Sequence, residues 1–197
     1  MGRDRLHEPE EIKRVSVPLR RAYKLINHGP TTLITSAAGG RRNVMTAAWV
    51  MAVDFDPAKI VAVIAADTFT RQLVEASGEF VVNVPTARMI DVVYAAGQVS
   101  GEDVDKLATL ALVASPASIV AAPLVEGCAA WLECRVVPEP HMQERYDLFV
   151  GEVVAAWADD ASFVDGVWRF PRDEDRTLHH LSSGVFVTSG DIVKAKS

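Results

Sequence analysis

The sequence predicts a mainly β domain, an antiparallel β-barrel of six to seven strands with short helices inserted between them. Two observations support this fold class. The runs of strand length are rich in β-branched and aromatic residues, and consecutive runs are mostly joined in hairpin order. The regular strand and helix alternation of a doubly wound parallel sheet is not sustained. Internal repeats and low-complexity linkers are absent from the sequence, which favours one domain over residues 1–197.

Glycine and proline mark the ends of the elements in the first half of the chain. Pro18 suits the first position of a helix, and Gly39-Gly40 suits a tight hairpin turn. Gly78 is typical of a residue that ends a helix, and Pro85 ends a strand. The elements expected here are a helix at 18–26, strands at 31–38, 42–51 and 59–66, a helix at 70–77 and a strand at 79–84.

The second half shows helical spacing first and strand-like alternation later. Ser100 and Asp103 are candidate N-caps of a helix that follows a polar segment. Trp168 and Phe170 suggest that part of an acidic, irregular stretch packs against the domain. The elements expected here are a helix at 87–96, a helix entrance at 100–106, strands at 127–137 and 147–158 around a loop at 138–144, and a last strand at 181–188.

Composition restricts the class of protein. With 197 residues, 49% of them hydrophobic and 23% charged, the chain is long enough for one well-filled globular core. No run reaches the roughly 18 apolar residues that a membrane helix needs. A formal net charge of −6 argues against a nucleic-acid partner, because binding to a phosphate backbone depends on clustered Lys and Arg. The charged amino terminus lacks an apolar signal core, so we expect a cytoplasmic protein.

Most familiar catalytic motifs are missing. The dinucleotide-binding G-x-G-x-x-G after a strand, the P-loop and the G-x-S-x-G nucleophile elbow do not occur. The five histidines do not have the spacing of a metal site, so no metal is expected. Cys128 and Cys134 fit neither a C-x-x-C pair nor an easy disulfide, and we expect buried thiols. If the protein is an enzyme, a bound organic cofactor carries the chemistry.

One stretch suits a flat aromatic ligand with an anionic tail. Small side chains let a planar ring lie close to the backbone, an indole can form a wall, and hydroxyls beside a guanidinium can hold a phosphate at a helix start. The residues concerned are Thr46, Ala47, Ala48, Trp49, Thr68, Thr70 and Arg71. A half-buried strand followed by an ordinary capped helix is the alternative interpretation of the same residues.

Four motifs in order resemble the flavin reductase-like family, which includes flavoredoxin and has the FMN-binding split-barrel fold. They are N-V-M-T-A-A-W from Asn43, T-R-Q-L-V-E-A-S-G-E-F-V-V-N-V-P from Thr70, S-G-E-D-V-D-K from Ser100 and F-V-G-E-V-V from Phe149. The resemblance covers about residues 18–190. It implies a Greek-key-type antiparallel barrel and a homodimer that holds FMN without a covalent bond near the subunit interface.

The resemblance also assigns residues to the cofactor. Asn43 and the segment 46–49 line the isoalloxazine and ribityl chain, while Thr70 and Lys106 belong to the phosphate region. Ser100 is a further cofactor-binding residue. Two positions depart from the family pattern. Thr68 stands where many members have a basic residue, so Arg71 either replaces its charge or faces solvent. Tyr146 stands where many have histidine, and Phe186 is a further candidate for the pocket wall.

The function implied is hydride transfer from NAD(P)H to the flavin, followed by release of reducing equivalents to oxygen, free flavin or a redox partner protein. The protein stacks and orients the reactants, and no side chain is required as a general acid or base. One alternative is an electron carrier that keeps FMN without direct NAD(P)H activity. Another is a split barrel that holds a different ligand, such as a deazaflavin or haem.

Overall fold

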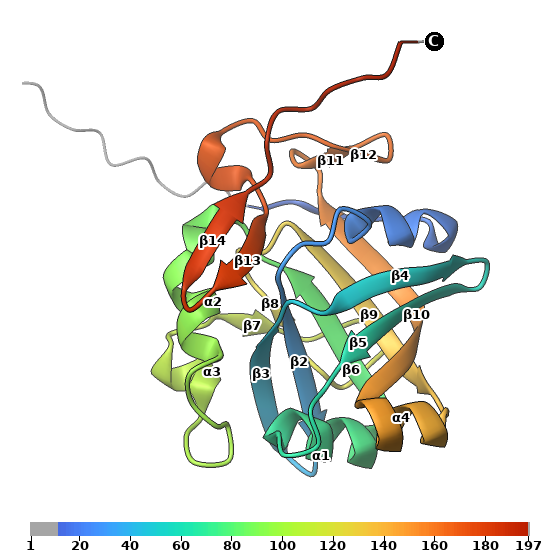
Figure 1. Ribbon diagram of the computed structural model, residues 1–197, viewed down its shortest axis with the longest axis vertical. Helices are drawn as coiled ribbons and strands as arrows, with labels where there is room; N and C mark the ends of the chain where they lie inside the picture. The colour runs from blue at the N-terminus through green and yellow to red at the C-terminus, as the bar shows by residue number, and fades with distance from the viewer. Residues whose placement is uncertain (1–11, 197) are drawn as a thin grey trace, which may run out of the picture.

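Seven antiparallel strands follow one another around a strongly curved sheet (Figure 1). Along the sheet the order is β3-β2-β6-β9-β10-β5-β4, and a short eighth strand, β1 (Arg14–Ser16), pairs with the far end of β10. The computed structural model describes residues 12–196. The seven strands are β2 (Thr32–Ala38), β3 (Arg41–Ala47), β4 (Val50–Phe55), β5 (Ala58–Val63), β6 (Glu79–Val84), β9 (Ala130–Val137) and β10 (Leu148–Asp159). This arrangement confirms the predicted antiparallel, mainly β fold.

The central strands are buried on both faces. Neighbouring residues of β2, β6 and β9 point to opposite sides, because side chains alternate along a strand. Inside the barrel lies one apolar cluster, which includes Ile34, Val82 and Leu132. Outside lies a second cluster that includes Leu33 and Trp131. Burial on both faces also encloses polar residues of these strands, namely Thr35, Asn83 and Glu133.

Short helices and small hairpins cover the sheet. In Figure 1, α1 and α4 lie at one end of the barrel, and α2 and α3 lie beside β3 and the C-terminal hairpin β13–β14. The helices are η1 (Leu19–Leu25), α1 (Phe69–Ser77), η2 (Ala87–Met89), α2 (Ile90–Ala96), α3 (Lys106–Thr109), α4 (Pro140–Tyr146) and η3 (Asp173–Asp175). The short strands are β7 (Ala114–Ser115), β8 (Leu124–Val125), β11 (Phe163–Val164), β12 (Val167–Trp168), β13 (Leu178–Ser182) and β14 (Val185–Thr188).

The single strand expected over 42–51 is two strands. Ala48 and Trp49 interrupt it, and here the chain passes from one end of the sheet order, β3, to the other end, β4. The prediction was wrong because both halves have the composition of a strand. Only the pairing of β3 with β2 and of β4 with β5 separates them.

Two later segments also differ from their predictions. The loop expected at 138–144 contains the helix α4, which has Pro140 in its first turn and ends at Asp147 in the left-handed conformation. The single strand expected at 181–188 is part of the β13–β14 hairpin, which turns at Ser183 and Gly184. The helix α4 forms in a polar segment whose composition indicates a loop, and the turn at Ser183 and Gly184 divides a segment whose composition indicates one strand.

Two helices begin after N-cap residues other than those expected. Thr68, not Thr70, is the N-cap of α1, and its Oγ1 accepts a hydrogen bond from Arg71 N at 3.2 Å. Asp105, rather than Ser100 or Asp103, caps α3. The helix expected at 18–26 is present as a 3₁₀ helix.

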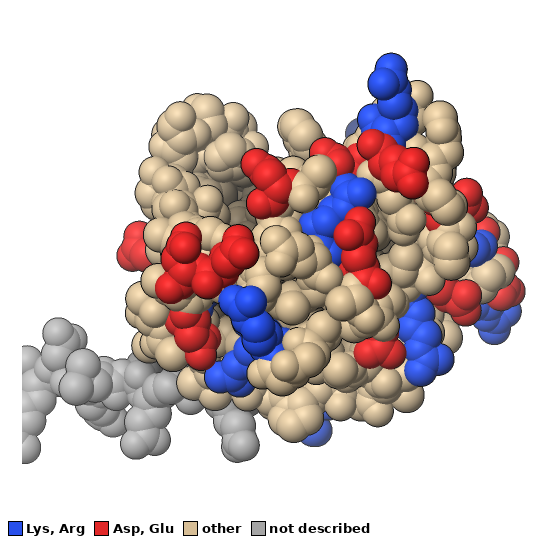
Figure 2. Space-filling view, turned by 90° about the horizontal axis from the view of Figure 1, so that it is seen from below, with Lys and Arg blue, Asp and Glu red and all other residues tan. Residues whose placement is uncertain are grey.

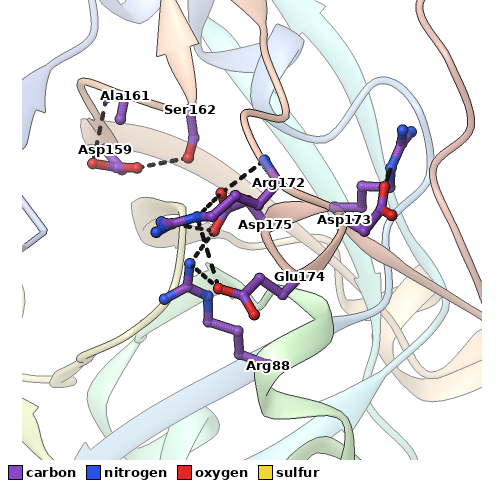
Figure 3. Close-up of polar contacts among 9 residues, drawn as sticks. Arg88, Asp159, Ala161, Ser162, Arg172, Asp173, Glu174 and Asp175 are labelled. Atoms are coloured by element: carbon purple, nitrogen blue, oxygen red, sulfur yellow. Dashed lines mark hydrogen bonds and ion pairs between the residues drawn. The ribbon is translucent and has the colours of Figure 1, made fainter. Parts of the chain in front are cut away.

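An ion-pair cluster fixes the chain just before the C-terminal hairpin (Figure 3). Arg88 Nη2 contacts Glu174 Oε1 at 2.8 Å and Asp175 Oδ1 at 2.6 Å. Arg172 Nε contacts the other oxygen of Asp175 at 2.9 Å. These contacts join η2 to η3, so that β13 begins at a defined place. A cavity of about 380 Å³ beside this cluster is lined by none of the predicted cofactor residues.

Both cysteines of the chain, Cys128 and Cys134, are free and buried, as expected. Within residues 12–196 no helix is long and apolar enough to cross a membrane.

Candidate functional site

Six of the predicted cofactor residues line one cavity of about 310 Å³. It lies between β3, the start of α1, the segment after α2 and the start of α3. The six residues are Asn43, Thr46, Thr68, Thr70, Ser100 and Lys106. We call this space the phosphate cavity because its polar groups, described below, suit an anion.

Lys106 is the buried cation of the phosphate cavity. It is only 5% exposed, and its Nζ donates a hydrogen bond to Ala96 O at 2.7 Å. Within residues 12–196 no carboxylate forms an ion pair with it. Burial lowers the pKa of Lys106 from its ordinary value of 10.5. A buried charge without a counterion costs free energy, so this lysine is suited to an anionic ligand.

Asn43 presents an acceptor that the fold leaves unused. Its Nδ2 donates to Thr70 Oγ1 at 2.9 Å, which orients the side chain. Its Oδ1 is buried, and in the part of the chain that the structure describes it has no hydrogen-bond partner. Because Thr70 Oγ1 accepts from Asn43, the Thr70 hydroxyl hydrogen can be donated elsewhere. The pair therefore offers one acceptor and one donor to a ligand.

Gly101 closes the cavity around Asn43. A Cβ atom on Gly101 would lie 1.9 Å from Asn43 Oδ1, a distance at which something must shift. The glycine thus allows the segment after Ser100 to approach β3 closely. The S-G-E-D-V-D-K motif contains this glycine, but its local sequence does not reveal the contact with Asn43.

The start of α1 supplies the third polar wall. Thr68, Phe69 and Thr70 line the phosphate cavity, and the N-terminus of this nine-residue helix is favourable for anions. The Thr68 hydroxyl donates to Ala65 O at 2.8 Å and accepts from Arg71 N, so it mainly fixes the helix start.

Arg71 points away from the phosphate cavity. Its Nε lies 2.6 Å from Glu75 Oε1 and its Nη1 lies 2.7 Å from Asp147 Oδ1. The guanidinium also lies over the Phe149 ring at 4.9 Å. Two carboxylates already neutralise this cation, so its placement offers no support for the predicted phosphate contact.

A second cavity of about 440 Å³ lies between β3, α2 and the β13–β14 hairpin. Thr46, Ala48 and Phe186 line it, as do Tyr94 and His180, which the sequence did not single out. We call it the hairpin cavity. Thr46 and Gly97 line both cavities, so the two spaces are neighbours.

Besides Arg71, three predicted residues line neither cavity. Ala47 is buried in the barrel core. Trp49 is 75% exposed at the β3–β4 break, and Tyr146 is 61% exposed at the end of α4, where its ring packs edge-on against His141. Trp49 and Tyr146 therefore lie at the surface of this single chain, and their contact with a cofactor stays a prediction.

The face seen in Figure 2 carries Lys and Arg side chains interspersed with Asp and Glu, without one continuous basic area. Among the described residues no group of three or more His, Cys, Asp or Glu side chains is placed to hold a metal ion. In the phosphate cavity, the buried Lys106 and the start of α1 suit an anionic ligand.

Comparison with known proteins agrees with this geometry. The Flavin reductase like domain profile matches residues 26–172. The uncharacterized protein YddH of Escherichia coli (strain K12) is 44% identical over 184 residues, which are 92% of this chain and 97% of YddH. The crystal structure of an FMN-binding domain of a flavin reductases-like enzyme from Shewanella baltica OS155 superposes with a TM-score of 0.92 and 39% identity, covering 94% of this chain and 99% of that one.

A more distant solved structure is similar as well. Flavoredoxin from Methanosarcina acetivorans superposes with a TM-score of 0.71 and 26% identity, covering 84% of this chain and 87% of its own. The family match spans most of the chain and includes β3, α1 and α3, which form the phosphate cavity. The protein therefore belongs to the flavin reductase-like domain family.

Proposed function

We propose that the protein is an FMN-binding oxidoreductase that uses NAD(P)H to reduce its flavin and passes the reducing equivalents to free flavin, oxygen or a partner protein. The observation that carries this proposal is the buried Lys106, which has no carboxylate partner within residues 12–196 and lines a cavity in a chain of this family. We infer that the whole chain acts as one such unit.

The residues of the phosphate cavity fit FMN. Lys106 and the N-terminus of α1 provide positive charge for the phosphate, and the Thr70 hydroxyl can donate to it. The unused Asn43 Oδ1 accepts from a hydroxyl of the ribityl chain. The small side chains of Thr46 and Ala48 leave their backbone accessible to the edge of the ring.

When bound, FMN supplies the two-electron chemistry by accepting a hydride from the nicotinamide. This chain holds the phosphate, orients the ring against β3 and keeps water from part of the site. Positioning of two flat reactants gives most of the acceleration in such a transfer, so no side chain has to move a proton.

Flavin titrations of the Lys106→Met variant test the proposal. Loss of a charge-assisted contact costs about 1.5–3 kcal/mol, so FMN affinity should fall by about 10- to 150-fold. Riboflavin, which lacks the phosphate, should bind this variant and the wild-type protein equally. Lys24→Met is the matched control, since Lys24 also donates to a backbone carbonyl, Gly166 O, outside both cavities. Unchanged FMN affinity in Lys106→Met would refute the assignment.

A second function, that of an electron carrier, is favoured by the 26% identity to a flavoredoxin. The two functions differ in their response to nicotinamides. A reductase loses its visible flavin absorption when NADH or NADPH is added without oxygen. An electron carrier keeps its absorption with both nucleotides and loses it only with dithionite.

We further infer that the protein forms a homodimer through β4. Every second residue of this stretch has an apolar side chain that is more than half exposed, namely Trp49, Met51, Val53 and Phe55. β4 ends the sheet order, and its apolar face starts next to Ala48, a wall of the hairpin cavity. Val53→Glu should give monomers in light scattering, whereas Val113→Glu, another exposed valine, should not. Dimeric Val53→Glu protein would exclude this interface.

A further inference from the structure

A further cation, Arg41 of β3, lies at the border of the phosphate cavity. Its guanidinium lies 4.0 Å from the centroid of the Phe69 ring, and its Nη2 donates to Glu102 O at 3.4 Å. Phe69 lines the phosphate cavity, as does Gly101, the residue before Glu102. Arg41 is therefore held between the start of α1 and the segment before α3, which form two walls of that cavity.

The tight turn before β3 fixes the position of this arginine. Gly39 and Gly40 have φ values of +57° and +78°, and β3 begins directly after them with Arg41 paired to Ala38. Side chains alternate along a strand, so Arg41 and Asn43 share one face of β3. Asn43 lines the phosphate cavity and has the unused Oδ1. The backbone thus directs Arg41 to the side of the strand on which the cavity lies.

Most hydrogen-bond donors of Arg41 are unused. Contact with the Phe69 ring occupies the flat face of the guanidinium and leaves the N–H groups at its edge available. The bond to Glu102 O uses one of them, and within residues 12–196 no carboxylate forms an ion pair with Arg41. The acidic side chains of the segment 102–105 share a neighbouring cavity of about 300 Å³ with Arg41 without pairing to it. Arg71, by contrast, is already neutralised by two carboxylates.

We infer that Arg41 is a second phosphate-binding cation of the flavin site and makes the site selective for a flavin that carries a phosphate monoester. Lys106 meets the phosphate from the buried side of the cavity, and Arg41 offers N–H donors from the exposed side. A guanidinium suits this role because it can bind a phosphate through two parallel hydrogen bonds. The inference rests on the proposed function, since Arg41 has this role only when FMN is bound. Arg41 thus supplies the charge that the sequence suggested for Arg71.

Fluorescence titrations of Arg41→Met with FMN and with riboflavin test this assignment without turnover. Methionine keeps an apolar contact with Phe69 but removes the charge. FMN affinity should fall by about fivefold, less than in Lys106→Met, because water screens the charge of the exposed Arg41. Riboflavin affinity should stay unchanged, because riboflavin has no phosphate. High salt should reduce the difference in FMN affinity between the wild-type protein and this variant.

Arg42→Met is the matched control. Arg42 has the same charge, is also exposed and, as the next residue on the strand, points to the opposite face of β3. Unchanged FMN affinity in Arg41→Met, or an equal loss of affinity for FMN and riboflavin, would overturn the role of Arg41. An equal loss of FMN affinity in Arg42→Met would also overturn it, because any surface charge would then have the same effect. Failure of the wild-type protein to bind FMN would instead refute the proposed function.

Discussion

A histidine at the root of the C-terminal hairpin should make the stability of the protein depend on pH. His28 Nε2 lies 2.9 Å from Thr177 Oγ1, and its ring packs edge-on against Trp168 and His179. Its Nδ1 is buried and, within residues 12–196, has no hydrogen-bond partner. Burial, and then the neighbouring His179, lower the pKa of His28 from 6.5 to about 4.

The sign of the effect follows from linkage. Because the pKa of His28 is lower in the folded than in the unfolded state, the unfolded chain binds the proton more readily. The neutral ring contributes stability that is fully present above pH 6.5 and is lost as pH falls toward 4. At about 1.4 kcal/mol per pKa unit the shift corresponds to roughly 3 kcal/mol, and screening of the half-buried ring reduces this to about 2 kcal/mol.

Urea unfolding of the wild-type protein and of His28→Gln at pH 7.5 and at pH 4.5 measures this contribution. Glutamine keeps a polar group for Thr177 but does not titrate. Between the two pH values the wild-type free energy of unfolding should fall by about 2 kcal/mol more than that of the variant. His141→Gln, in which an exposed histidine is removed, controls for the loss of an imidazole. If wild type and His28→Gln lose the same stability, the lowered pKa of His28 does not affect folding.

Three further substitutions test other contacts. Glu133→Gln should destabilise the fold by about 3 kcal/mol in urea unfolding, because the buried carboxylate accepts bonds from three backbone N–H groups and two side chains, and the amide NH₂ group would face at least two of these donors. A loss below about 1 kcal/mol would contradict this. Gly151→Ala would place a Cβ 2.6 Å from Phe80 Cζ. This overpacking should cost about 1–3 kcal/mol and lower the midpoint temperature of thermal unfolding. An unchanged midpoint would show that the Phe80 ring moves freely. Gly101→Ala should displace Asn43 and weaken FMN binding about tenfold or more, and Gly190→Ala, which meets nothing within 4 Å, should bind FMN normally.

Local patterns predicted the strands better than the connections between them. The continuous apolar run at 59–66 matches β5, and 79–84 matches β6 in full, because buried strands have a strong compositional signal. The break at Ala48 has no comparable signal. The break depends on how its two flanking strands pair with strands elsewhere in the chain, and local composition does not indicate that pairing.

The residues of the candidate site were also predicted only where local motifs identify them. Asn43, Thr70 and Lys106 could be named from their motifs, and the structure brings them to one cavity. Arg71 follows Thr70 directly, yet neighbours on a helix point about 100° apart, and the partner Asp147 lies 76 positions away in the sequence. Tyr94 and Phe186 form the hairpin cavity from distant segments, so no local pattern could have paired them.

The break between β3 and β4 connects three features that seem unrelated in the sequence. It ends the pairing of β3 with β2 after Ala47, and the small residues Thr46 and Ala48 on either side are walls of the hairpin cavity. It moves the chain to the opposite end of the sheet order, so that β4 pairs on one side only, with β5. It also exposes Trp49 as the first of the alternating apolar residues on β4. If this face joins two subunits, dimer formation and the hairpin cavity share one wall, and disruption of the β4 contact should weaken FMN binding as well as assembly.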